Sequence, residues 1–168
     1  MPAENLFAAM TPERAAYLTG LPKKRAAAGV LFADNLGRSL LVEPTYKTYW
    51  QLPGGIVDAD ESPLTAAERA LGRELGLSIK PGRLLVVDWV PPSPNRIEGL
   101  LFVYDGATLS SDEWSAISLP PGELSRWAWC TESELQDRLP AHMLRRTLAA
   151  LRARADGTTL YLEDGAAA

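Results

Sequence analysis

The stretch that decides the fold runs from Leu52 to Leu77 and reads LPGGIVDADESPLTAAERALGRELGL. A Pro-Gly-Gly turn follows Leu52, and an amphipathic segment begins at Ser62-Pro63 and ends at Gly76. A serine before a proline is typical of a helix start, and a glycine after the last apolar residue is typical of a helix end. The stretch therefore predicts a strand, a glycine loop and a helix, in that order.

The spacing of residues inside this stretch follows a known pattern. Seven positions match it after the Leu-Pro-Gly-Gly start, namely Gly55, Glu61, Arg69, Leu71, Glu74, Gly76 and Leu77. The pattern resembles the Nudix box, in which Gly, five residues, Glu and seven residues precede Arg-Glu-apolar-any-Glu-Glu-any-Gly-apolar. The resemblance extends over residues 24–155. It implies an α+β protein with the Nudix fold, an α/β/α sandwich around a mixed β-sheet.

The resemblance also implies a magnesium site that cleaves diphosphate compounds. In the family, carboxylates at the positions that match 70, 73 and 74 lie on one side of the helix and hold the metal. The backbone of the Gly54-Gly55 turn can approach the same metal because glycine has no side chain. Glu61 and Arg69 match an ion pair that braces the loop on the helix, and Gly76 closes the helix.

Two of the three helix carboxylates are missing from this chain. The matching positions hold Ala70 and Arg73, so that only Glu74 remains. A methyl group cannot bind magnesium, and a guanidinium repels a dication. We therefore expect Mg²⁺ or Mn²⁺ to be held weakly or atypically, with Glu74 as a catalytic and metal-binding residue and the Gly54 carbonyl as a further ligand.

Other residues could complete the site. Glu98 could replace a lost ligand or act as a base, or could be a solvated acid at a loop end. Arg73 could grip a phosphate with its planar guanidinium, or could pair with a nearby acid. Tyr46 and Trp89 could stack on a base, although aromatic residues at such positions more often serve packing. Lys47 could reach a phosphate or be solvated.

The composition excludes several other classes of protein. The chain has 168 residues, 17 basic and 21 acidic side chains and a net charge of -4, which indicates neither a nucleic-acid surface nor a membrane anchor. Residues 1–21 contain charges and no long apolar run, so we expect no signal peptide and a cytoplasmic protein. Cys130 and His142 are the only residues of their kinds. We interpret Cys130 as a core residue and His142 as a helix-surface residue.

The remaining chain is predicted to form one domain with two appendages. Residues 1–23 form an N-terminal arm with a short helix that begins at Thr11-Pro12, and residues 156–168 form a tail with a frayed end. Between them we expect a hairpin of residues 26–32 and 39–42, strands at 83–90, 100–104 and 125–130, and two helices after Thr131 and Pro140. The oligomeric state is not predicted.

Three functions are consistent with these residues. The first is a hydrolase of nucleoside diphosphate-linked or other diphosphate small molecules that uses Glu74, Glu98 and one metal ion. The second is a module that binds a nucleotide or diphosphate metabolite without cleaving it and needs no metal. The third is an enzyme of the same fold that has moved to non-hydrolytic chemistry.

Overall fold

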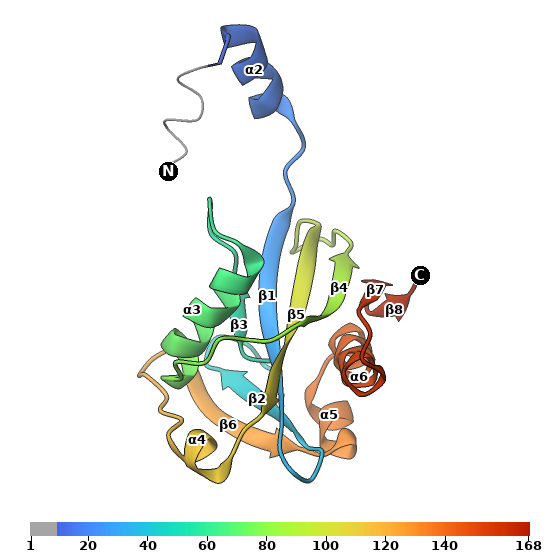
Figure 1. Cartoon of the computed structure of the whole chain (residues 1–168). Coiled ribbons are helices and arrows are strands. Elements are labelled where there is room, and N and C mark those ends of the chain that lie inside the picture. The colour runs from blue at the N-terminus through green and yellow to red at the C-terminus, as the bar shows by residue number, and fades with distance from the viewer. Residues whose placement is uncertain (1–9) are drawn as a thin grey trace.

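The computed structural model describes residues 10–168, so residues 1–9 of the predicted arm lie outside the described part. Its elements follow the chain as a mixture of strands and helices (Figure 1). They are α2 (Pro12–Gly20), β1 (Arg25–Ala33), β2 (Ser39–Pro44), β3 (Gly54–Ile56), α3 (Pro63–Leu75), β4 (Leu84–Val90), β5 (Gly99–Thr108), α4 (Ser111–Ser115), β6 (Leu124–Cys130), α5 (Glu132–Arg138), α6 (Ala141–Asp156), β7 (Leu160–Glu163) and β8 (Ala166–Ala167).

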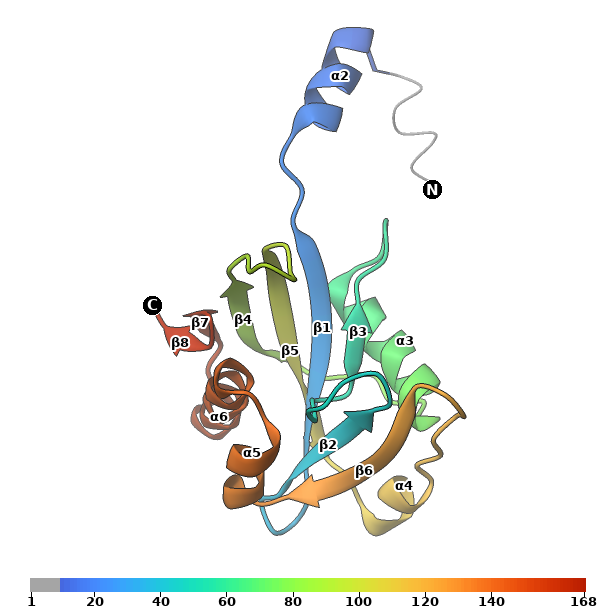
Figure 2. The same cartoon turned by 180° about the vertical axis from the view of Figure 1, so that it is seen from behind.

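A mixed sheet forms the middle layer. Its strand order is β6-β2-β1-β5-β4-β7-β8, and β3 pairs with β1 beside this path. The pairs β1–β5 and β4–β7 are parallel, whereas the other pairs are antiparallel. Figures 1 and 2 show α3 on one side of the sheet and α5 and α6 on the other. The predicted α/β/α sandwich is confirmed.

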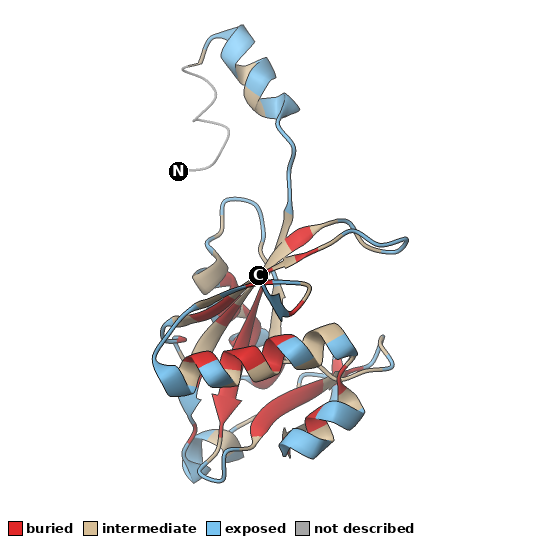
Figure 3. Ribbon diagram, turned by 90° about the vertical axis from the view of Figure 1, so that its right-hand side faces the viewer, coloured by how far each residue is buried: buried red, intermediate tan, exposed pale blue. Residues whose placement is uncertain are grey.

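Hydrophobic clusters on both faces hold the helices on the sheet, because successive side chains of a strand point to opposite faces. On β1, Val30 and Phe32 pack in the cluster that contains Leu71 of α3. Leu31, between them, packs in the cluster that contains Ala150 and other small residues of α6. Figure 3 shows the buried stripe along α6 where the helix faces the sheet.

The helix that follows the glycine loop begins and ends where the sequence predicts. The Ser62 side chain accepts a hydrogen bond from the backbone of Thr65 at 3.1 Å, and Gly76 caps the other end with a left-handed backbone. The capping box predicted at Thr131 is also present, with Glu134 as its second member. Local signals therefore set the helix boundaries.

The predicted tail is part of the sheet. β7 pairs with β4, and β8 pairs with β7, so the expectation that the C-terminal alanines fray is wrong for Ala166–Ala167. The buried Asp88 carboxylate accepts the Gly165 backbone N–H at 3.0 Å and the Arg146 Nε–H at 2.6 Å. This network ties the chain end to β4 and α6.

The N-terminal helix α2 contrasts with the rest of the fold. None of its residues is buried, and it extends away from the sandwich (Figures 1 and 3). Thr11 caps it as predicted. Within residues 10–168, no helix has the length and apolar character needed to span a membrane.

Candidate functional site

The loop between β3 and α3 is braced by the arginine and glutamate of the box. Arg69 Nε donates to Glu61 Oε1 at 2.7 Å, and its Nη2 donates to Glu61 Oε2 at 2.8 Å and to the Ile56 carbonyl at 3.0 Å. Hydrogen bonds from Arg69 lower the pKa of Glu61 to about 2. Asp58 adds a contact to Arg69 at 3.1 Å. The structure thus brings together the two residues that the sequence pairs.

Glu74 lies behind the glycine turn and is 3% exposed. Its Oε2 accepts the Gly54 backbone N–H at 2.9 Å, and its Oε1 lies 3.8 Å from Arg73 Nη2. Burial, which disfavours the charged form, raises the pKa of Glu74 to about 7. The remaining helix carboxylate is therefore engaged with the turn and is partly protonated at neutral pH.

The two replaced positions also lie at the glycine turn. A Cβ atom on Gly55 would be 3.6 Å from Ala70 Cβ and 3.5 Å from Arg73 Nη2. Ala70 is fully buried. Arg73 extends further, and its Nε lies 3.3 Å from Glu123 Oε2. Arg73 contacts acids and also lines the neighbouring cavity. Its position is therefore consistent with both expected roles, which are pairing with a nearby acid and binding a phosphate.

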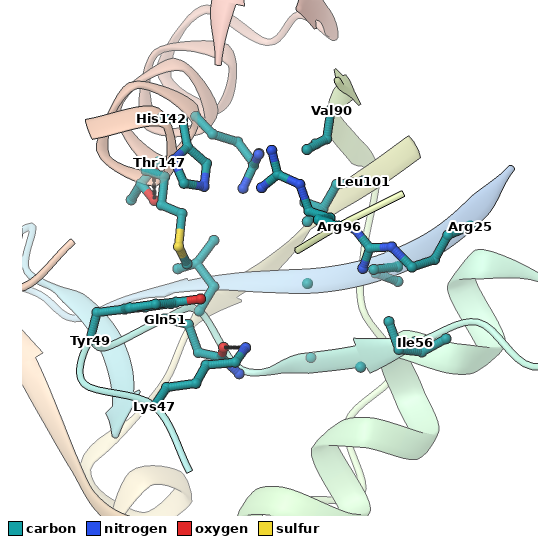
Figure 4. Close-up of a pocket in the computed structure, with 18 of the residues that line it drawn as sticks. Arg25, Lys47, Tyr49, Gln51, Ile56, Val90, Arg96, Leu101, His142 and Thr147 are labelled. Atoms are coloured by element: carbon teal, nitrogen blue, oxygen red, sulfur yellow. Dashed lines mark hydrogen bonds between the residues drawn. The ribbon is translucent and has the colours of Figure 1, made fainter. Parts of the chain in front are cut away.

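A cavity of about 440 Å³ opens beside the turn, between the 46–51 loop, β1, β3 and the start of α6 (Figure 4). Asp58 is the only carboxylate among its lining residues, and it already contacts Arg69. The cationic side chains of the lining are Arg25, Lys47, Arg69, Arg73, Arg96 and Arg146. The cavity therefore carries a clear excess of positive charge.

Lys47 and two tyrosines form the wall next to the turn. Lys47 Nζ donates to Gln51 Oε1 at 2.8 Å (Figure 4). The same Nζ lies 5.4 Å from the ring centre of Tyr46 and 5.6 Å from that of Tyr49. Burial lowers the pKa of Lys47. Tyr46 is 67% exposed at the mouth of the cavity, so its ring offers a flat surface to a ligand.

Glu98 and Trp89 lie elsewhere, and the structure does not bring them to the glycine turn. Trp89 Nε1 donates to Glu98 Oε2 at 3.0 Å, and Lys24 Nζ contacts Glu98 Oε1 at 2.6 Å. Neither Trp89 nor Glu98 lines the cavity. Gly29 is the residue of β1 that pairs with Gly54 of the glycine turn. Lys24 lies five residues before Gly29, which corresponds to about 17 Å along an extended chain. Glu98 therefore does not join Glu74 in one metal site.

His142 lies at the start of α6 and is partly buried, and its imidazole lines the cavity, a position that the sequence analysis does not predict (Figure 4). Burial and the positive charges of Arg146 and Arg96 lower its pKa, so it is neutral at pH 7. Cys130 is buried among the residues of a core cluster, as predicted. His142 and Arg146 lie four residues apart, so they share one face of α6. This spacing is the sequence signal that predicts both on the same side of the helix.

Comparison with known proteins identifies the family. The model of the NUDIX domain matches residues 23–151. The chain belongs to the Nudix family. A MutT-like protein of Streptomyces ambofaciens is 28% identical over 129 residues, which are 75% of each chain. Nudix proteins include pyrophosphohydrolases, and their hydrolases generally use divalent metal ions such as Mg²⁺ or Mn²⁺.

Solved structures share the fold at lower identity. The MutT protein of Methanosarcina mazei has a TM-score of 0.64 and 21% identity, covering 82% of this chain and 99% of that one. The Nudix domain of Shewanella oneidensis NrtR, crystallised with ADP ribose, has a TM-score of 0.66 and 17% identity, covering 92% and 99%. These likenesses confirm the Nudix fold.

The Nudix box of this chain does not fit a magnesium centre. Magnesium requires hard oxygen ligands in a nearly octahedral arrangement, and a carboxyl must lose its proton to bind a metal. The box offers a methyl group at Ala70, a guanidinium at Arg73 and a buried Glu74 carboxyl. Among the residues that the structure describes, no group of three or more Asp, Glu, His or Cys side chains could hold a metal ion.

Proposed function

We propose that this Nudix domain binds a diphosphate-containing small molecule, such as a nucleotide metabolite, without a divalent cation to hold the phosphates. The observation that carries the proposal is the charge of the cavity. Its lining has six cationic side chains and one carboxylate, Asp58, which contacts Arg69. Arg73 supplies fixed positive charge at a box position where Nudix hydrolases generally use a divalent metal ion.

The chemistry of Arg73 and Lys47 suits phosphate oxygens. A guanidinium can form two parallel hydrogen bonds to a phosphate, and an ammonium acts as a compact point charge. Arg73 lies at the Gly55 backbone, and Lys47 lies on the facing loop. The contact of Arg73 with the half-exposed Glu123 is weak enough to be exchanged for a ligand, because exposed ion pairs contribute little.

The aromatic mouth of the cavity suits the flat part of a nucleotide. Tyr46 and Tyr49 line it beside Lys47. Stacking of a base or nicotinamide on a tyrosine adds to the binding energy. The ADP ribose bound to the Shewanella oneidensis domain supports a ligand of this size on this fold.

A hydrolase is the second candidate, favoured by the raised pKa of Glu74. A carboxyl with a pKa of about 7 can accept a proton at physiological pH, as a general base must. Because Glu74 is buried and bonded to Gly54, we expect any hydrolysis to be slow and its dependence on Mg²⁺ or Mn²⁺ to be atypical. Family membership supports this candidate.

The test is calorimetric titration of ADP-ribose and ADP into Arg73→Gln, Lys47→Gln and the unchanged protein, with a phosphate-release assay on the same samples. We expect each variant to lose about tenfold in affinity, as for a lost charge-assisted hydrogen bond. Arg152→Gln is the matched control, because Arg152 is an exposed arginine outside this cavity. Equal affinities in all four proteins would refute the proposal, and turnover that Glu74→Gln abolishes would establish the hydrolase.

A further inference from the structure

We infer a second anion site in the same cavity, formed by Arg25 and Arg96, that takes an additional phosphate group of the ligand. The inference rests on the proposed function and restricts the class of ligand that the cavity binds. The ligand class it names is a diphosphate compound that carries a further phosphate at a distance from the diphosphate. Both arginines line the cavity, and Arg96 lies between Arg25 and His142 in the view of Figure 4.

The two arginines differ from the other arginines of the lining because, like Lys47, they form no ion pair with an acid of the described residues. Arg69 has Glu61, Arg146 has Asp88, and Arg73 contacts Glu123. Within residues 10–168, no carboxylate forms an ion pair with Arg25 or with Arg96. Two uncompensated positive charges therefore remain at one end of the cavity.

Their hydrogen bonding is incomplete as well. The Nε atoms of Arg25 and Arg96 are buried and lack a hydrogen-bond partner among the described residues. Arg96 uses only Nη2, which donates to the Pro91 carbonyl at 3.2 Å. A buried donor without a partner, above all a charged one, is rare in folded proteins because it has lost its water. A phosphate bound by the guanidinium groups would neutralise the charge of both arginines.

Arg25 enters the cavity from a different part of β1 than the glycine turn. Arg25 pairs with Gly99 on β5, and Gly29 pairs with Gly54 on β3. Four residues of β1 thus separate Arg25 from the glycine turn, which corresponds to about 13 Å. A ligand with an anionic group beyond the diphosphate could therefore place that group on Arg25 and Arg96.

Glu98, which precedes the strand partner of Arg25, already pairs with another cation. The carboxylate of Glu98 contacts Lys24, the residue before Arg25. On the other side, the carboxylate of Asp88 is shared between Arg146 and the Gly165 backbone. The surrounding acids are therefore committed, and Arg25 stays available to an external anion.

The loop that carries Arg96 holds it in place before a ligand arrives. Ser93 and Arg96 exchange two backbone hydrogen bonds of 2.8 and 3.1 Å, and three prolines at positions 91, 92 and 94 restrict the backbone. A rigid binding group loses little conformational entropy when it binds. The neutral His142 beside Arg96 does not add further positive charge.

The first test detects the site directly. In ¹H–¹⁵N spectra of the arginine Nε–H groups, assigned with Arg25→Lys and Arg96→Lys, inorganic phosphate is titrated into the full chain at constant ionic strength with chloride. We expect saturable shifts of the Arg25 and Arg96 signals and none of the exposed Arg152 signal. If these two signals respond no more than that of Arg152, the site does not exist.

The second test identifies the ligand class by calorimetry with EDTA present. Two matched pairs differ by one ribose phosphate, namely NAD⁺ with NADP⁺ and dephospho-coenzyme A with coenzyme A. We expect the phosphorylated member of at least one pair to bind about tenfold more tightly. Arg25→Gln or Arg96→Gln should bring the ratio of the two affinities within that pair close to one, whereas Arg152→Gln should retain the preference.

The outcomes separate the two proposals. If phosphate shifts the arginine signals but neither pair binds, the proposed function fails and the anion site stands. Equal affinity within both pairs overturns the assignment of a phosphorylated diphosphate ligand. A preference that persists in Arg25→Gln and Arg96→Gln would show that the additional phosphate is bound elsewhere.

Discussion

Replacing Glu74 by glutamine should change how the stability of the fold depends on pH. Burial raises the pKa of this carboxyl from 4.5 to about 7, so the folded protein holds its proton more tightly than the unfolded chain. The stabilisation from this proton is fully present below pH 4.5 and is lost as the pH rises through about 7. The shift corresponds to about 3 kcal/mol, at about 1.4 kcal/mol for each pH unit.

Urea unfolding followed by tryptophan fluorescence at pH 4.5, 6, 7 and 8 measures this effect. Relative to the unchanged protein, Glu74→Gln should gain about 3 kcal/mol in unfolding free energy between pH 4.5 and 8, because its amide does not titrate. Glu68→Gln is the control, since Glu68 is exposed on the same helix. Parallel pH profiles for Glu74→Gln and the unchanged protein would refute the reasoning.

Three further changes test other parts of the structure. Asp88→Asn should lower the unfolding free energy by about 3 to 5 kcal/mol in urea melts, because it leaves Arg146 buried without its counter-charge; a loss below about 1 kcal/mol would contradict this. The double change Ala70→Glu with Arg73→Glu should create Mg²⁺ binding detectable by calorimetry, and no gain would mean that more than the ligand set has diverged. Tyr46→Ala should weaken ADP-ribose binding about fivefold without lowering the melting temperature, and an unchanged Kd would remove Tyr46 from the site.

The sequence predicts those parts of the fold that local signals set. The caps of α3, the hairpin of β1 and β2 and the contact between Glu61 and Arg69 all lie within short stretches of chain with a fixed spacing. The Nudix resemblance then supplies the order of the layers. The sequence does not predict β7, because a strand of only four residues is too short a pattern to distinguish from a tail.

The cavity could not be predicted in the same way, since its residues meet only through the fold. Arg25, Arg96 and His142 come from a strand start, a proline loop and a helix start that no periodicity connects. From the sequence, Glu98 and Trp89 are assigned to the site only because they lie next to the proline loop that follows the box. In the structure, Glu98 instead contacts Lys24, the residue before β1, and accepts a hydrogen bond from Trp89.

The central claim is that fixed cations of this Nudix domain replace the metal in holding a diphosphate. Its most direct test is the Kd of ADP-ribose measured by calorimetry in EDTA and again in excess Mg²⁺. The structure predicts binding in EDTA with a Kd that Mg²⁺ leaves unchanged or raises, because magnesium would compete with Arg73 and Lys47 for the phosphates. Binding that requires Mg²⁺ would contradict the claim and would mean that Glu74 and other acids do assemble a metal site.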